Sequence, residues 1–190
     1  YVDLEMWPLA YQKAQELLKK SGYATCHVGK WHCNGLFNSP EHPQPGDHGF
    51  DYWFSTQNNA APSHLNPTNF VRNGKPAGPL QGYSSTIIVN QAVEWLQQDW
   101  NKEQPFCLFV WFHAPHEPIA TADEFLKRYP GQEGAIYYGN VSQMDQEFGR
   151  LMKTIDAMKL RDNTYVMFTS DNGPSPKGNC RYPFGVATPL

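Results

Sequence analysis

The sequence has no cluster of positive charge and no long apolar run. Its 15 lysine and arginine residues are scattered, and 18 aspartate and glutamate residues outnumber them, which gives a net charge of −3. Nucleic acids and acidic membrane surfaces bind clustered Lys and Arg, so we expect neither as a partner. The longest apolar run, Phe106 to Phe112, is much shorter than the roughly 20 residues that cross a bilayer, so we expect no membrane span.

Cysteine is also scarce. The 190 residues contain four cysteines: Cys26, Cys33, Cys107 and Cys180. They are too few for a disulfide scaffold at this length, and the sequence leaves their pairing open. No signal peptide is recognisable, although the chain begins at Tyr1 rather than at Met. By contrast, 16 Pro and 15 Gly concentrate in residues 39–79 and 173–189, which predicts long ordered loops around a compact frame.

Helices and strands are expected to alternate along the chain. The clearest signal is a long helix whose apolar residues recur at alternating spacings of four and three. They are Tyr137, Val141, Met144, Phe148, Leu151, Ile155 and Met158. The other expected elements are a helix at Leu9–Lys20, a strand at Tyr23–Val28, a helix from a capping Ser84 or Ser85 to about Trp100, a strand at Phe106–Phe112 covered on both faces, a short helix near Asp123–Arg128 and a buried final strand from about Thr164. This order predicts an α/β fold with helices around a mostly parallel sheet.

Polar side chains follow the ends of all three expected strands. They are Lys30 and His32 after the first strand, His113 and His116 after the second, and Asp171 and Asn172 after the third. The carboxyl ends of parallel strands meet at one edge of a sheet, and ligands bind outside that edge. We therefore expect one site to contain residues from all three groups.

The residue types at this edge suit the ester of an oxyanion. Lys30 supplies a cation, and His32 and His116 can donate or accept a proton near neutral pH. Asp171 and Asn172 offer hard oxygen ligands to a divalent cation. A lysine and a metal ion would bind a sulfate or phosphate ester, and a histidine near the bridging oxygen would protonate the departing alcohol.

The same residues also have simpler structural interpretations. Residues 170–174, Ser-Asp-Asn-Gly-Pro, also read as a turn, and Lys30 could be an ordinary solvated lysine. We expect His113 to hydrogen-bond backbone at its strand end, which leaves His116 as the site histidine. The aromatic residues of segment 49–54 are expected to pack on the frame.

A zinc site is a further alternative. The candidate ligands would be Cys26, His27, His32 and Cys33. Their spacing does not match a tetrahedral zinc motif, and Cys26 and His27 would point to opposite faces of a strand. The sequence therefore favours a hard cation at Asp171 and Asn172 over zinc at the first strand.

These motifs resemble those of the type I, formylglycine-dependent sulfatases of the alkaline phosphatase superfamily, including arylsulfatase-like and N-acetylgalactosamine-6-sulfatase-like members. The matching segments are residues 21–25 with Gly29-Lys30-Trp31-His32, His48-Gly49-Phe50-Asp51, His113-Ala114-Pro115-His116, Met144-Asp145, and residues 162–164 with Thr169 to Pro174. The resemblance covers almost the whole chain, except for residues 65–82. It implies an alkaline-phosphatase-like sandwich of helices around a mostly parallel sheet.

The resemblance also implies a role for each matched residue. Lys30 would contact the sulfate and the nucleophile, and His32 would hydrogen-bond the formylglycine hydrate. His116 would bind the sulfate and assist the departing alcohol. Asp171 and Asn172 would be ligands of a divalent cation, usually Ca²⁺ and less often Mg²⁺. In the family's mechanism a hydrated aldehyde attacks sulfur, the alcohol leaves, and the sulfate is expelled by elimination.

Parts of the family pattern are missing from this sequence. The nucleophile arises from Cys or Ser followed by x-Pro-x-Arg, and no Cys or Ser here has those neighbours. No strand with acidic metal ligands precedes Leu9, and the surroundings of Lys177 do not match those of the family's second sulfate-binding lysine. We therefore interpret residues 1–190 as part of a single sulfatase catalytic domain, incomplete at both ends. The formylglycine would lie outside this chain, which alone should be inactive.

The expected function is hydrolysis of a sulfate ester, with a sulfated carbohydrate as the expected substrate. A phosphodiesterase or phosphonate monoester hydrolase of the same superfamily shares this set of residues and is an alternative. A non-catalytic relative that binds sulfated glycans is another. The resemblance also implies a secreted, periplasmic or lysosomal protein.

Overall fold

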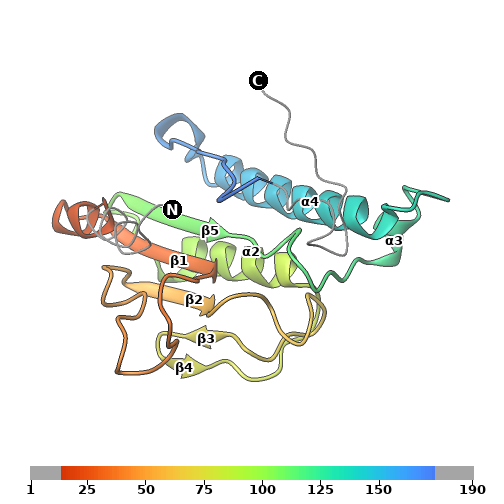
Figure 1. The fold of residues 1–190 in the computed structure, drawn as a ribbon. Coiled ribbons are helices and arrows are strands. Elements are labelled where there is room, and N and C mark those ends of the chain that lie inside the picture. The colour runs from red at the N-terminus through yellow and green to blue at the C-terminus, as the bar shows by residue number, and fades with distance from the viewer. Residues whose placement is uncertain (1–13, 174–190) are drawn as a thin grey trace.

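The computed structural model describes residues 14–173, which are built around a mixed five-stranded β-sheet (Figure 1). The strands are β1 (Ala24–Lys30), β2 (Tyr52–Thr56), β3 (Val71–Arg72), β4 (Lys75–Pro76) and β5 (Phe106–Trp111). Their order across the sheet is β4-β3-β2-β1-β5. β1 pairs in parallel with both β2 and β5, whereas β3 and β4 add antiparallel pairs at one edge. The predicted α/β fold with a mostly parallel sheet is confirmed.

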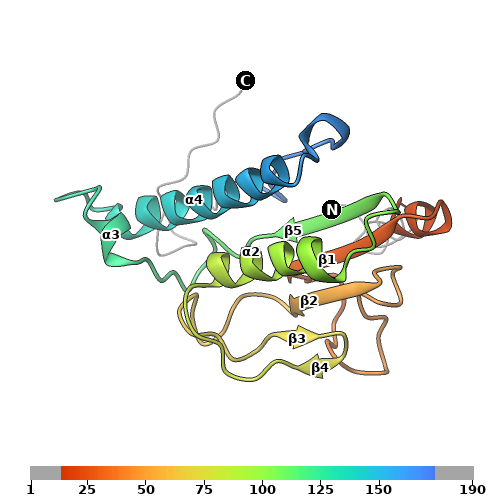
Figure 2. The same ribbon diagram turned by 180° about the vertical axis from the view of Figure 1, so that it is seen from behind.

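The helices lie where the sequence predicted them. They are α2 (Ser84–Glu94), which continues as a π-helical segment at Trp95–Asp99, α3 (Asp123–Leu126), α4 (Ala135–Ala157) and a 3₁₀ turn at Arg161–Asn163. Residues 14–20 are also helical, and the rest of the helix expected from Leu9 lies outside the described residues. Figure 2 shows α2 lying across β1 and β5, with α4 beside it. Within residues 14–173, no helix has both the length and the apolar character needed to cross a membrane.

β1 is buried on both of its faces. Cys26 and Val28 are fully buried in a cluster that also contains Ile88 of α2 and Leu96 of the π-helical segment. His27 points the other way, into a ring of aromatic side chains. Its neighbours there are Trp31, Phe50 and Trp111. The opposed directions of Cys26 and His27 and the packing role of the 49–54 aromatic residues are therefore as predicted.

The start of α2 differs from the prediction. Neither Ser84 nor Ser85 caps the helix, because the N-cap position belongs to Tyr83 and no side chain caps it. Both serines are buried, and the Oγ atom of Ser84 lies 3.1 Å from Nδ1 of His64. The hydroxyl is engaged in a tertiary contact, which a local capping rule does not consider.

The buried face of α4 is only partly the predicted stripe. Leu151 and Ile155 are buried as expected, but the amino-terminal half of the helix buries polar and small residues instead. These are Gly139, Asn140, Gln143 and Glu147. The three polar side chains form hydrogen bonds: Nδ2 of Asn140 donates to the Ala120 carbonyl (3.0 Å), Gln143 accepts from the Ala122 N–H (2.9 Å) and Glu147 accepts from the Thr86 hydroxyl (3.0 Å). The spacing of the apolar residues correctly identified the helix. Hydrogen bonding by its polar side chains decided which face the helix buries.

The predicted final strand is not formed. Residues 164–168 are irregular, and within residues 14–173 they pair with none of the five strands. Tyr165 is fully exposed and Met167 is 92% exposed, so the expected burial was also wrong. Every residue of β5 is only half-buried, which does not match the prediction of cover on both faces. An apolar segment forms a strand only where a neighbouring strand supplies hydrogen bonds. Within residues 14–173, no strand pairs with residues 164–168.

Candidate functional site

Lys30 lies at the carboxyl end of β1, at the edge where the sequence placed the site. It is the last residue of β1, and the next N–H, that of Trp31, donates to the Thr56 carbonyl at 2.9 Å, which fixes the strand end against β2. Trp31 is buried and stacks on Trp111. Within residues 14–173, the Lys30 ammonium forms no hydrogen bond or ion pair. This half-buried cation is therefore available to an anion.

His32 is exposed and has a left-handed backbone, with φ of 48°. The pKa of its ring is lowered from the ordinary value, first by partial burial and then by the positive charges of Lys30 and His116. The Asp171 carboxylate acts on this pKa in the opposite direction. Charges from all three groups that the sequence singled out therefore influence the pKa of His32. The neutral ring favoured here can accept a proton.

His116 is held by side chains that the sequence reasoning missed. Its Nδ1 atom lies 2.8 Å from Nδ2 of Asn59 and 2.8 Å from the Glu117 carbonyl oxygen. Its own carbonyl accepts a hydrogen bond from Nε2 of His64 at 2.7 Å, and its N–H donates to the His113 carbonyl at 2.9 Å. Asn59 and His64 lie more than 50 residues earlier in the chain, so no local pattern indicated the contact.

His113 does not bond to backbone as predicted. The residue is 1% exposed, and its Nε2 atom lies 2.8 Å from the hydroxyl oxygen of Thr56. That hydroxyl donates its one hydrogen to the Asn58 carbonyl at 2.6 Å, so Nε2 of His113 must be the donor. Burial, followed by the nearby charges of His64 and Lys30, lowers the pKa of His113 well below its ordinary value. The prediction failed because β2 places a hydroxyl within reach of the ring.

We expect the protein to lose stability as the pH falls below about 6.5, the ordinary histidine pKa. Burial lowers the pKa of His27 to about 3 and also lowers those of His64 and His113. In this pH range the unfolded chain binds protons that the buried rings do not bind in the folded chain. As the pH falls, His27 should therefore lower the free energy of unfolding by about 1.4 kcal/mol per pH unit, and His64 and His113 should act in the same direction. Urea unfolding between about pH 7 and pH 5 measures the slope. His27→Asn should reduce it, whereas the same change at exposed His42 should not, and equal slopes would contradict this account.

Asp171 and Asn172 are exposed and follow the irregular segment rather than a strand. The Asn172 side-chain N–H donates to the Gly173 carbonyl at 2.7 Å, which leaves its Oδ1 atom as an acceptor. Together with the Asp171 carboxylate it offers two hard oxygens, which suit Ca²⁺ in kind. Calcium takes about six to eight oxygens, so these two residues would be part of a site.

The structure does not assemble the alternative zinc site. Cys26, Cys33 and Cys107 are free thiols, while Cys180 lies outside the described residues. No group of three or more His, Cys, Asp or Glu side chains within residues 14–173 is arranged to hold a metal ion. Burial raises the pKa of the Cys33 thiol to about 11, which disfavours the thiolate that zinc requires.

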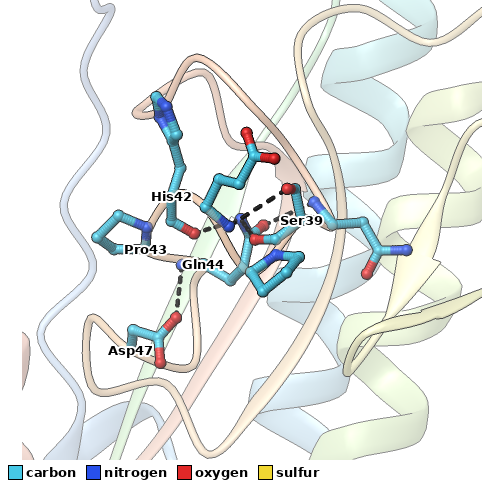
Figure 3. A pocket seen from close by; sticks show the side chains of 8 residues that line it. Ser39, His42, Pro43, Gln44 and Asp47 are labelled. Carbon is cyan, nitrogen blue, oxygen red and sulfur yellow. Dashed lines mark hydrogen bonds between the residues drawn. The ribbon is translucent and has the colours of Figure 1, made fainter.

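A surface hollow is lined by residues 38–44 and Asp47 of the loop between β1 and β2 (Figure 3). Gln44 organises its wall, because its side-chain N–H groups donate to the carbonyls of Ser39 and His42. Asn38, on its rim, faces Gly74 in the β3–β4 turn. That turn adjoins the amino end of β2, where Asn73 accepts a bond from the Trp53 N–H at 2.7 Å. Lys30, His32 and His116 are not among the residues that line the hollow.

Comparison with known proteins identifies relatives across nearly the whole chain. The family model described as Sulfatase matches residues 15–189. Sequence identity is 29% over 218 residues with the "Uncharacterized sulfatase YdeN" of Escherichia coli (96% of this chain, 39% of that protein). It is 30% with the "Ulvan-active sulfatase" of Formosa agariphila (89% and 36%) and 29% with the N-acetylgalactosamine-6-sulfatase of Homo sapiens (87% and 33%). The chain thus spans less than half the length of these curated relatives.

Solved structures confirm the fold. The structure of Ps i-CgsB superposes with a TM-score of 0.70 at 24% identity, covering 79% of this chain and 37% of that one. The structure of BT4656 "in complex with its substrate D-Glucosamine-2-N, 6-O-disulfate" gives 0.57 at 19% identity, covering 79% and 47%. The predicted alkaline-phosphatase-like arrangement of helices around the sheet agrees with these neighbours.

Proposed function

Because the chain belongs to the sulfatase family, we propose that it forms part of an enzyme that hydrolyses sulfate esters. The observation that carries the proposal is the unpaired Lys30 ammonium at the end of β1, beside His32 and His116. A preorganised cation at a strand end favours a sulfate group and the charge that develops on it during hydrolysis.

The two exposed histidines would move protons. The Nδ1 side of the His116 ring is occupied by Asn59 and the Glu117 carbonyl, which leaves Nε2 to face the ester. An N–H at that position would protonate the bridging oxygen as the alcohol departs. His32, whose pKa is lowered, would accept a proton on the nucleophile's side.

Two further groups complete this proposal. A formylglycine outside this chain would supply the nucleophile, in the manner that the family resemblance implies. Asp171 and Asn172 would offer oxygens to a calcium ion, which would supply positive charge to the site. The remaining ligands would come from residues other than those described.

We further propose a sulfated carbohydrate as the substrate. Relatives are named as an ulvan-active sulfatase and an N-acetylgalactosamine-6-sulfatase, and one solved neighbour holds a disulfated glucosamine. Another was solved with k-i-k-neocarrahexaose. These names support a carbohydrate ester without indicating which sugar position carries the sulfate.

The test is sulfate release by the full-length protein from sulfated oligosaccharides in the presence of calcium, followed by ion chromatography. We expect turnover of sulfated substrates, no turnover by isolated residues 1–190, and loss of activity on calcium chelation. Faster release from phosphate diesters or phosphonate monoesters would instead assign the related hydrolase activity. Binding of sulfated glycans without release, together with an unmodified nucleophile position by mass spectrometry, would assign a non-catalytic binder.

A further inference from the structure

The loop that carries His116 is fixed largely by one distant segment. The loop runs from His113 to Pro118 after β5, and within it the His116 N–H donates a backbone hydrogen bond to the His113 carbonyl. The carbonyls of His116 and Glu117 both accept hydrogen bonds from residues 59–64, which follow β2. The bond to the His116 carbonyl fixes the peptide that follows the His116 Cα atom, and the bond to the Glu117 carbonyl fixes the next one, so both restrict where the His116 side chain starts.

His64 provides the first of these bonds. Its ring is 1% exposed, and Nε2 lies 2.7 Å from the His116 carbonyl oxygen. Because a carbonyl can only accept, Nε2 carries the hydrogen and Nδ1 must accept, here from the Ser84 hydroxyl at 3.1 Å. The Ser84 N–H also donates to the His64 carbonyl at 2.7 Å. His64 therefore connects the first residue of α2 to the backbone of His116 in one defined tautomer.

Asn59 provides the second bond. Its Nδ2 atom lies 2.7 Å from the Glu117 carbonyl oxygen and 2.8 Å from Nδ1 of His116. Because the Glu117 carbonyl can only accept, the amide must present its nitrogen there, which fixes the orientation of the Asn59 side chain. The Asn59 carbonyl is itself held by Asn69 Nδ2 at 2.9 Å. The contact covers the Nδ1 edge of the His116 ring and leaves Nε2 uncovered.

We propose that Asn59 and His64 are positioning residues, which fix the backbone and the ring of His116 so that Nε2 meets the bridging oxygen of the ester. The inference rests on the proposed function, since it assigns these residues to the reaction of that site. Neither residue touches the ester, and both act through His116. A displacement of about 1 Å at a catalytic group can reduce the rate about 100-fold, so loss of either contact should have a large effect.

The test uses four variants of the full-length protein, one of them a control, with a sulfated oligosaccharide. His64→Leu removes the donor to the His116 carbonyl and should lower kcat about 100-fold with little change in KM. His64→Gln retains a side-chain N–H at similar reach and should restore most of kcat. Asn59→Ala, at a half-buried loop position that should not compromise folding, should lower kcat in the same way. Ser63→Ala is the matched control, because its hydroxyl bonds only within its own turn at Leu65.

A crystal structure of each full-length variant gives a readout that does not depend on activity. We expect the His116 ring to be displaced in His64→Leu and in Asn59→Ala, and to keep its position in His64→Gln and Ser63→Ala. If the wild-type protein releases no sulfate, the proposed function fails, but these positions still test the contacts. An unmoved His116 in both damaging variants overturns the inference, as does a His64→Gln variant as impaired as His64→Leu, which would assign His64 to packing alone.

Discussion

Replacing Gly29 with alanine is expected to destabilise the protein by about 4 kcal/mol or more, at the upper end of single-residue effects. Gly29 has φ of +109°, and a Cβ atom built on it would lie 1.9 Å from the carbonyl oxygen of Trp111 in β5. Gly29 and Trp111 are paired in register across β1 and β5. Relief of the overlap would require the two strands to separate at the end that carries Lys30.

Gly78→Ala is the matched control for Gly29→Ala. Gly78 also has positive φ, +75°, but no atom lies within 4 Å of its added Cβ. Its substitution should cost only the backbone strain, about 1 kcal/mol. Urea unfolding of both variants separates backbone strain from the clash. Equal losses of stability would show that β1 and β5 adjust without cost at this position.

Replacing Lys30 with methionine is expected to lower kcat/KM for a sulfate ester about 100- to 1000-fold in the full-length protein. Methionine keeps much of the length of the side chain but removes the cation that faces the site. Within residues 14–173 the ammonium has no ion-pair partner whose loss would disturb the fold, so folding should be retained. Inorganic sulfate should also inhibit the variant less strongly, because the product shares the anionic group.

Lys19→Met is the control for the loss of a positive charge near β1. Lys19 precedes β1 and forms an ion pair with Asp51 at 2.7 Å, close to the strand's amino end. Its substitution should leave sulfate release unchanged. Lys30→Arg should retain part of the activity, since the charge remains but the larger planar group does not fit the same position. Unaltered kinetics in Lys30→Met would remove Lys30 from the site.

The site positions that the sequence predicted follow from rules that act over short distances. The alternation of helices and strands implies parallel strands, whose carboxyl ends share one edge, and this places Lys30 and His116 together. The charge of Asp171, from the third group, acts on the pKa of His32. The roles of these residues remain predictions for the kinetic tests.

The sequence by itself determined the α/β architecture, the helices, and the two strands β1 and β5 with the polar residues that follow them, because periodicity and turn residues act within a few positions of the chain. It did not predict β2, β3 or β4, whose residues lie in a segment rich in Pro and Gly. Tertiary structure decided which face α4 buries, why residues 164–168 form no strand, and what His113 bonds to. It also decided that Asn59 and His64 hold His116 across more than 50 residues. Hydrogen bonds between distant segments depend on where the fold places donors and acceptors, and no local pattern in the sequence encodes that placement.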